Sequence, residues 1–169
     1  MASVTKAGII RDVLIESLSE EHVNVLDQLI EPKYDEDVAS ELDLKATIVR
    51  TLLNDLHESG LVEYQRTKNK KTGWYTYLWV RREDKIIDYA QKYLQTALSE
   101  LNLQLNDETQ NVTFQCECMR VPYDTAMDAD FLCGSCGRSF EECNNSQIID
   151  GIVSEVSRLN SLLEQTNNE

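Results

Sequence analysis

Four of the five cysteines stand in two close pairs, Cys116 with Cys118 and Cys133 with Cys136. Thiolates arranged as two close pairs on short turns can surround one Zn²⁺ ion tetrahedrally. The metal then takes the place of the hydrophobic core that so short a segment lacks. The spacing therefore predicts one structural zinc ion held by these four residues.

The two cysteine pairs differ in regularity. Cys133-Gly-Ser-Cys136-Gly has the form of a zinc knuckle, whereas Cys116-Glu-Cys118 has a single intervening residue, so its local turn must differ. Cys143 is either a spare thiol or a substitute ligand. A thioredoxin-like redox centre would need a strand-helix-strand context, which is absent around Cys133. Val112 and Phe114 lead into the first pair, and Phe140 follows the second. Tyr123 and Phe131 are expected to supply apolar filling between the pairs, so that a metal and a few rings form the whole core.

Charge is unevenly distributed along the chain. The net charge of −14 disfavours a protein that coats nucleic acid through phosphate contacts. Residues 64–82 nevertheless carry six cations and no acid, which leaves −20 for the remainder. We expect one small basic surface on an acidic protein. The acidity serves either solubility or adaptation to a salty cytoplasm, or it forms an acidic docking face. The six cations are Arg66, Lys68, Lys70, Lys71, Arg81 and Arg82.

The chain contains neither an apolar run of about 18 residues nor a basic-then-apolar leader, so it predicts no membrane span and no secretory signal. We therefore expect a cytoplasmic protein, in which paired cysteines are more often metal ligands than disulfides. A length of 169 residues with 41% hydrophobic residues suits two small domains joined by a connector.

Apolar periodicity predicts several helices in the first 60 residues. They cover Lys6–Leu18, Glu20–Ile30, a short segment capped by Asp35 that stops at Asp43, and Lys45–Ser59 closed by Gly60. The last two form a helix-turn-helix. Two strands, Leu61–Arg66 and Trp74–Val80, follow with a turn at Asn69–Gly73, and this order predicts a winged helix.

The second strand of the wing is expected to place aromatic rings on both faces, with Trp74, Thr76, Leu78 and Val80 on one and Tyr75, Tyr77 and Trp79 on the other. Only one face of the hairpin can belong to the core, so the other face either packs under a helix or binds a ligand. Rings interleaved with cations suit stacking on unpaired bases, at roughly 1 to 3 kcal/mol per base. The candidate binding residues are Arg66, Lys68, Lys70, Lys71, Trp74, Tyr75, Tyr77 and Trp79.

The helix over 45–59 would read a DNA major groove in a sequence-specific winged helix. Its exposed residues form a nearly neutral set, in which Arg50 is expected to be an ordinary solvated side chain. Sequence-specific recognition of a duplex is therefore weakly supported, and the wing is the better nucleic-acid candidate. The set comprises Lys45, Thr47, Arg50, Asn54, Asp55 and Glu58.

Two apolar stripes predict long helices, one over 83–110 and one after the cysteine module. These helices pack on each other or on the winged helix, or leave a seam free for a partner protein. Residues 165–169 are polar and are expected to fray. The stripes are Ile87, Ala90, Leu94, Ala97, Leu101 and Leu105, and then Ile149, Ile152, Val156, Leu159 and Leu163.

Catalysis has no local basis in this sequence, which shows no nucleophile-base pair, phosphate-binding glycine loop or carboxylate dyad. His22 and His57 fall in predicted helices as ordinary surface or boundary residues. We interpret the chain as a binding protein and not an enzyme. The alternatives are an autonomous winged-helix transcriptional regulator whose cysteine site senses metal or oxidant, and a scaffold whose helices recruit another subunit.

The order of parts resembles archaeal transcription factor E, the counterpart of the alpha subunit of general transcription factor IIE. The resemblance covers nearly the whole chain, and the phrases KTGWYTYLW and PYDTAMDADFLCGSCG are specific for that family. Cys116-Glu-Cys118 departs from the two-residue gap usual in relatives. The expected fold is α+β and mainly helical, with a winged helix over 1–82, a helical linker over 83–110, a zinc ribbon over 111–145, and a C-terminal helix and tail over 146–169.

The resemblance implies a transcription initiation factor that docks on the clamp and stalk of RNA polymerase and helps to keep promoter DNA melted. The wing around Lys70, Lys71, Trp74 and Tyr75 would lie close to the non-template strand. TATA-binding protein, promoter DNA and a second factor subunit are the further partners that it implies.

Overall fold

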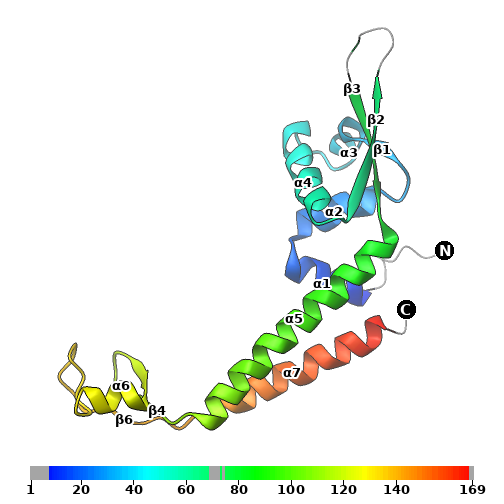
Figure 1. The fold of residues 1–169 in the computed structure, drawn as a ribbon. Coiled ribbons are helices and arrows are strands. Elements are labelled where there is room, and N and C mark those ends of the chain that lie inside the picture. The colour runs from blue at the N-terminus through cyan, green and yellow to red at the C-terminus, as the bar shows by residue number, and fades with distance from the viewer. Residues whose placement is uncertain (1–7, 69–72, 74, 168–169) are drawn as a thin grey trace. The chain divides into compact units, whose positions relative to one another are not determined.

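The computed structural model describes residues 8–68, 73 and 75–167, which form two compact units (Figure 1). Unit 1 comprises Met1–Leu94 with Leu162–Glu169, and unit 2 comprises Gln95–Ser161. Helices α5 (Glu83–Gln110) and α7 (Ser146–Thr166) each contribute to both units. The fold is mainly helical with two small antiparallel sheets, which confirms the predicted α+β class. The domain boundaries given above stay predictions.

Unit 1 is a winged helix. Helices α1 (Gly8–Ser17), α2 (Glu20–Gln28), α3 (Asp35–Glu41) and α4 (Ala46–Glu58) precede strands β2 (Val62–Lys68) and β3 (Tyr75–Arg81), and β1 (Lys33–Tyr34) lies between α2 and α3. The sheet order is β1-β3-β2. Within the described ranges no helix combines the length and hydropathy that a membrane crossing requires.

The ends of the helices follow from local chemistry. The hydroxyl of Ser19 accepts a hydrogen bond from the backbone N–H of His22 at 3.4 Å and so caps α2. Gly60 follows α4 with φ +74°, the left-handed conformation predicted for it. Asp35 does not cap α3 as predicted. Tyr34 occupies the capping position, and the carboxylate of Asp35 instead accepts a hydrogen bond from Arg50.

Two of the six cations counted in the wing are paired with carboxylates within unit 1, and one of them, Arg81, is buried. The side chain of Arg81 is 1% exposed, and it donates to Glu83 Oε1 at 2.6 Å and to the carbonyl of Leu26 at 3.3 Å. Arg82 pairs with Glu63 and Asp84, both at 2.9 Å. The predicted basic surface is thus smaller than the sequence count, because these charges are neutralised locally.

The buried stripe of α5 differs from the predicted one. Ile86, Ala90, Leu94 and Leu98 are buried at four-residue spacing, whereas the predicted Ile87 and Ala97 are only half-buried. A helix turns once in about 3.6 residues, so side chains spaced by four residues stay on one face nearly as well as side chains spaced alternately by three and four. The helical period alone therefore did not distinguish Ile86 from Ile87 as the buried residue.

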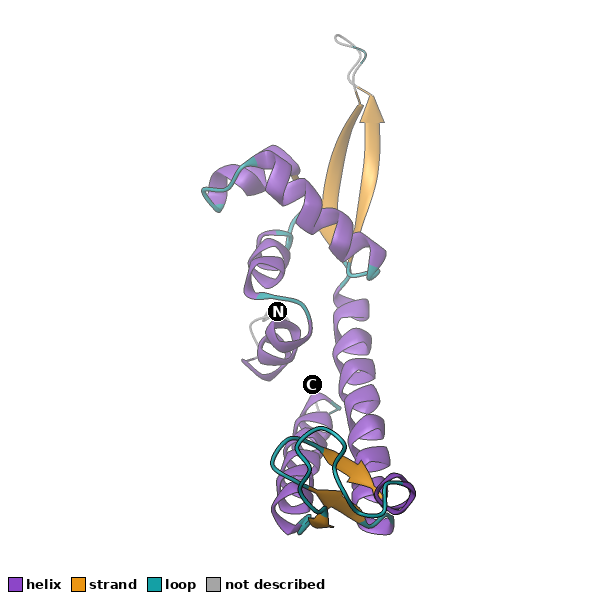
Figure 2. Ribbon diagram, turned by 90° about the vertical axis from the view of Figure 1, so that its left-hand side faces the viewer, coloured by secondary structure: helices purple, strands orange, loops and turns teal. Residues whose placement is uncertain are grey.

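The predicted stripe of α7 is confirmed: Ile152 and Leu159 are buried, and the other members are half-buried. Within unit 2, α7 runs back beside the last turns of α5 (Figure 2). The helix extends to Thr166, which is 1% exposed and whose carbonyl accepts a hydrogen bond from Gln91 at 3.4 Å. The expectation that residues 165–169 fray is therefore wrong as far as Thr166.

Trp79 tests how unit 1 is held together. Its ring is 5% exposed and lies 4.9 Å from the ring of Tyr64 and 6.1 Å from that of His57. We expect Trp79→Ala to lower the free energy of unfolding by about 3 to 5 kcal/mol, the range for removing a large buried ring. Chemical denaturation followed by circular dichroism measures this loss.

Tyr75→Ala is the matched control, because Tyr75 is 47% exposed on the same strand. It should cost less than about 1 kcal/mol, as is usual for exposed substitutions. Equal losses from the two variants would contradict the assignment of Trp79 to the core.

Candidate metal centre and wing surface

The cysteine module within unit 2 is a small sheet with one short helix. Strands β4 (Thr113–Gln115), β5 (Arg120–Pro122) and β6 (Glu141–Glu142) pair antiparallel in the order β5-β4-β6, and α6 (Tyr123–Asp128) follows β5. Neither the short strands nor α6 was predicted, since segments of two to six residues carry no readable period. The sheet brings the two cysteine pairs, distant in sequence, to one end of the module.

The four predicted ligand sulfurs converge. All four Sγ atoms lie within 4.8 Å of one another. Cys118 Sγ is 3.4 Å from both Cys116 Sγ and Cys133 Sγ, and Cys136 Sγ is 3.7 Å from Cys116 Sγ. Four sulfurs placed about 2.3 Å from a tetrahedral zinc ion would be about 3.8 Å apart, so this donor set fits such an ion. The single-residue gap in Cys116-Glu-Cys118 does not prevent convergence.

Both cysteine turns are closed by backbone hydrogen bonds. The N–H of Cys116 donates to the carbonyl of Met119 at 3.0 Å, and that of Cys133 to the carbonyl of Arg138 at 2.8 Å. Gly137, with φ +71°, donates to the carbonyl of Cys133 at 2.8 Å. A left-handed residue is needed at this position, and glycine adopts it without strain.

The thiols of the cluster differ in acidity. Backbone N–H groups of Cys136 and Ser135 donate to Cys133 Sγ and lower the pKa of that thiol to about 6. Hydrogen bonds among the sulfurs raise the pKa of Cys118, chiefly through Cys133 and then Cys116. The thiol of Cys133 is thus more acidic than that of Cys118, whose proton a bound cation would displace.

Cys143 lies outside the four-sulfur cluster. Its Sγ donates to Gln115 Oε1 at 3.3 Å, and its backbone N–H donates to the carbonyl of Thr113 at 2.8 Å. Of the two roles left open by the sequence, the geometry favours the spare thiol.

The hydrophobic core of the module is small. Ala126, Cys133 and Phe140 are buried, and Phe114 and Phe131 pack against them with ring centroids 5.0 Å apart. Tyr123 lies against both rings, at 5.9 and 6.1 Å, but at 45% exposure it covers this core and does not fill it as predicted. Val112 is 50% exposed and is not part of this core. Because Cys133 is both a ligand and a core residue, metal binding and packing depend on the same position.

A polar network joins the module to the end of α5. Arg120 donates to Glu108 Oε1 at 2.8 Å, to Thr113 Oγ1 at 2.8 Å and to Asn145 Oδ1 at 2.9 Å. Asn145 in turn donates to the carbonyl of Glu108 at 3.2 Å. The side chain of Glu108 is 10% exposed, and the hydrogen bond from Arg120 lowers its pKa. Sequence reasoning missed this network, because residues of opposite charge this far apart give no periodic signal.

In unit 1, the ladder between β2 and β3 decides which candidate binding residues share a face of the wing. Lys68 is opposite Tyr75, Arg66 opposite Tyr77, and Tyr64 opposite Trp79, so all six point to one side. The guanidinium carbon of Arg66 lies 3.5 Å from the centroid of the Tyr75 ring, and Lys68 Nζ lies 5.7 Å from it. Lys70, Lys71 and Trp74 lie outside the described residues.

The burial of Trp79 corrects its assignment as a binding residue, since at 5% exposure it belongs to the core and supports Tyr64. Tyr75 and Tyr77 remain accessible, at 47% and 38% exposure. The opposite face of the described hairpin is polar near its tip, where the hydroxyls of Thr67 and Thr76 lie 2.8 Å apart. The prediction of aromatic rings on both faces of the hairpin depends on Trp74, which lies outside the described residues, so it stays a prediction.

The exposed face of α4 offers little for reading a major groove. Arg50 was expected to be an ordinary solvated side chain, but it pairs with Asp35 and, at 3.6 Å, with Glu36. Asp55 and Glu58 add negative charge to the same helix. These carboxylates repel phosphate, so the structure agrees with a helix that does not bind duplex DNA.

Comparison with known proteins gives the chain its family. The family model for the TFIIE alpha subunit matches residues 8–110, which is more than half of the chain. The chain belongs to the TFIIE alpha family. This confirms the resemblance drawn from the sequence.

Archaeal relatives extend the match beyond the winged helix. Transcription factor E of Methanocaldococcus jannaschii is 32% identical over 86% of this chain and 86% of the relative. The transcription factor E proteins of Methanococcus aeolicus and Metallosphaera sedula are 34% and 33% identical, over 88% and 76% of this chain and 89% and 76% of the relatives.

A solved structure supports the fold alone. A possible transcriptional regulator from Methanosarcina mazei Go1 superimposes with a TM-score of 0.52 at 20% identity, over 58% of this chain and 87% of that one. As a TFIIE alpha homologue, the chain is a transcription initiation factor that acts with the transcription machinery, in a family that is not an enzyme family.

The metal centre of this TFIIE alpha homologue gives a direct prediction about stoichiometry. Cys118→Ser should lose the bound metal, because the sulfur of Cys118 lies 3.4 Å from two of the other ligands. Cys143→Ser is the matched control and should keep one metal ion per chain. Elemental analysis of the purified variants measures the ratio, and equal metal contents in the two would contradict the assignment of the ligands.

The Glu108–Arg120 pair predicts a dependence of stability on pH. The pKa of Glu108 is lowered in the folded protein, so its carboxylate stabilises unit 2 above the ordinary pKa, and this stabilisation is lost as pH falls through the lowered value. Glu108→Gln should cost about 1.5 to 3 kcal/mol at neutral pH, the range for hydrogen bonds to charged groups. Denaturation at neutral and acidic pH, followed by near-ultraviolet circular dichroism, measures both quantities.

The difference between Glu108→Gln and the unchanged protein should shrink as pH falls. Asp107→Asn is the control, because Asp107 is exposed on the preceding position of α5. A constant difference across the pH range would show that ionisation of Glu108 does not contribute.

Proposed function

We propose that this protein binds the clamp and stalk of RNA polymerase and stabilises the open promoter complex, with its wing beside the non-template strand. The observation that carries this proposal is the single face of the hairpin on which Arg66 and Lys68 lie with exposed tyrosines. Tyrosine rings stack on unpaired bases without regard to sequence, and adjacent cations attract phosphates. Melted DNA offers both groups, whereas a duplex hides its bases.

The charge of α4 supports docking on protein in place of sequence-specific duplex binding. Arg50 is already paired with carboxylates, and the net charge of −14 repels free DNA. An acidic factor of this kind does not accumulate on bulk DNA and reaches the promoter only with the polymerase. TATA-binding protein, promoter DNA and a second factor subunit are the further partners in this proposal, and its compartment is the cytoplasm.

The proposed factor acts by shifting a population of states. It adds binding free energy only when the clamp is open and the promoter is melted, so it favours that state without chemical work. A coupling free energy of about 1 to 3 kcal/mol is ordinary for such a shift, and its effect is greatest where melting is unfavourable.

The cysteine cluster would hold one structural Zn²⁺ ion through Cys116, Cys118, Cys133 and Cys136. Four thiol donors without an accompanying water or carboxylate are typical of a structural site. The metal would keep the module folded, and the module would present its own surface to the polymerase.

The wing supplies the test. Replacing Arg66, Lys68 and Tyr75 together by alanine should reduce permanganate reactivity of promoter thymines in the presence of polymerase, because the stacking ring and its two cations are removed. Lys70, Lys71 and Trp74 form a second set for the same measurement. Gln65→Ala with Thr67→Ala is the control, since both residues are exposed on the opposite face of β2.

Unchanged melting in the triple variant would remove the wing from the mechanism. A gel-shift titration of the protein alone over genomic fragments tests the autonomous regulator. Tight, sequence-dependent binding of a duplex without polymerase would overturn the proposal in favour of that regulator.

A further inference from the structure

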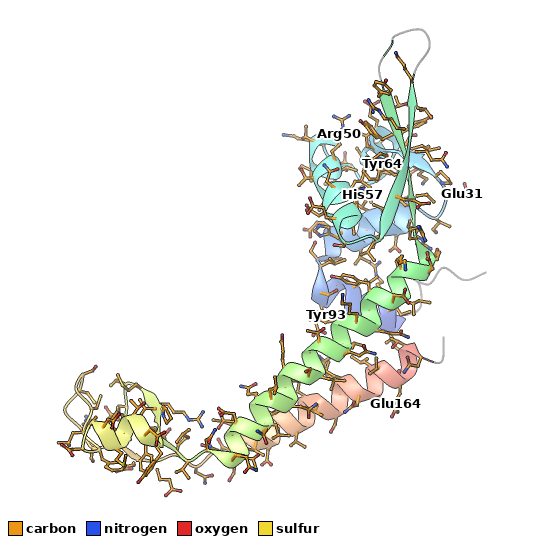
Figure 3. All side chains as sticks on the ribbon, in the orientation of Figure 1. Glu31, Arg50, His57, Tyr64, Tyr93 and Glu164 are labelled. Atoms are coloured by element: carbon orange, nitrogen blue, oxygen red, sulfur yellow. The ribbon has the colours of Figure 1, made fainter. Side chains whose placement is uncertain are left out.

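A hollow lies in unit 1 beside the aromatic face of the wing. It consists of two adjoining parts of about 460 and 300 Å³, which share Asp35, Arg50 and Tyr77 in their walls. The walls come from the start of α3, the exposed side of α4 and the hairpin, where Tyr75 borders the larger part and Tyr77 lines both parts. Figure 3 shows Arg50 of α4 and Tyr64 of β2 on this side of the unit.

The hollow has an acidic rim. Asp35, Glu36 and Asp37 follow one another at the start of α3, and Arg50 is the only cation in the described walls. Arg50 pairs with Asp35 and Glu36, which leaves Asp37 exposed and without an ion-pair partner in the described part of the chain. Three carboxylates against one guanidinium give the rim a net negative charge, so it repels phosphate and attracts a cation.

The inner wall of the hollow is aromatic. Tyr64 and Tyr77 are 41% and 38% exposed, and their rings meet edge to face with centroids 5.1 Å apart. The buried ring of Trp79 holds Tyr64 from behind at 4.9 Å. Two partly exposed rings that pack against each other beside carboxylates form a site for a cation that is planar or carries an apolar stem.

The same sheet face already binds a guanidinium. The guanidinium carbon of Arg66 lies 3.5 Å from the centroid of the Tyr75 ring. Tyr75 is two residues nearer the tip of the hairpin than Tyr77, on the same face. This intramolecular contact shows that a tyrosine of this face accepts the flat side of an arginine. Arginine suits such a site better than lysine, because its planar group stacks on a ring while its N–H groups bind carboxylates.

We infer that the aromatic face is divided between two kinds of ligand. Its basic end, with Arg66, Lys68 and Tyr75, serves nucleotides, and the acidic hollow around Tyr77 and Asp37 takes an arginine side chain of a partner protein. This assignment rests on the proposed function only in naming the polymerase as the partner. It moves Tyr77 from the nucleic-acid set to a protein-docking site.

Nuclear magnetic resonance of the tyrosine rings in the full chain tests the division. A short peptide containing arginine should shift the resonances of Tyr64 and Tyr77, and the same peptide with glutamine in place of arginine should not. Oligothymidylate should shift Tyr75 more than Tyr77. Shifts of Tyr77 with oligothymidylate and none with the arginine peptide would overturn the inference.

Charge reversal at the rim gives the matched variants. Asp37→Lys should weaken binding of the arginine peptide by up to about fivefold, the upper end for one exposed ion pair, and leave the response of Tyr75 to oligothymidylate unchanged. Glu31→Lys makes the same change of charge at an exposed position on the other side of the hairpin from Arg50 (Figure 3) and should bind the peptide like the unchanged protein. If both variants weaken binding of the arginine peptide equally, the effect comes from the net charge of the protein, and the hollow is not a site for arginine.

Polymerase binding by the same variants separates the two proposals. If the unchanged protein binds purified polymerase and Asp37→Lys weakens that binding more than Glu31→Lys does, the polymerase supplies the arginine. If the unchanged protein does not bind polymerase, the proposed function fails, and the peptide titration still decides whether the hollow takes an arginine.

Discussion

Directly opposed residues of an antiparallel ladder share one face of the sheet, and the seven pairs between β2 and β3 therefore decide what the wing presents. A slip of one residue would move Tyr75 and Tyr77 to the other face and bring Thr67 and Gln65 opposite them. Trp79 opposes such a slip, because its ring is buried and would become exposed. The buried end of the hairpin thus fixes the register of its exposed end.

The cysteine module depends on a different constraint, the scarcity of its apolar core. Ala126 and Phe140 are buried beside Cys133, and the sulfur of Cys133 belongs to the metal cluster. Hydrophobic burial on this scale does not offset the conformational entropy of the segment, and an ion held by the four thiolates would supply the difference. Arg120 and Glu108 then tie the module to α5 through charge and not through packing.

Periodic features of the sequence predicted the winged helix, the two long helices and the grouping of the four cysteines, because each has a repeat or a spacing set by its geometry. β1 and α6 were missed, since two and six residues are too few to show a period. The stripe of α5 was misjudged at Ile86 because neighbouring isoleucines fit a helical repeat almost equally well.

The burial of Arg81 was detectable in principle, since it alternates in phase with Trp79 along β3. The count of surface cations included Arg81 because it did not consider which face of the strand each side chain occupies. The pairing of Arg50 with Asp35, and that of Arg120 with Glu108, depends on tertiary contacts that a sequence does not encode locally. These pairs are what changed the interpretation of α4 and revealed the support of the metal module.

The position of Trp79 also makes unit 1 optically distinct. The chain has two tryptophans, Trp74 and Trp79, and the sequence of unit 2 contains neither. With Trp74 replaced by phenylalanine, intrinsic indole emission would arise from Trp79 alone, at the short wavelengths of a dry environment. Unfolding of the winged helix could then be followed by tryptophan fluorescence alone, because the cysteine module contains no tryptophan and contributes nothing to that emission.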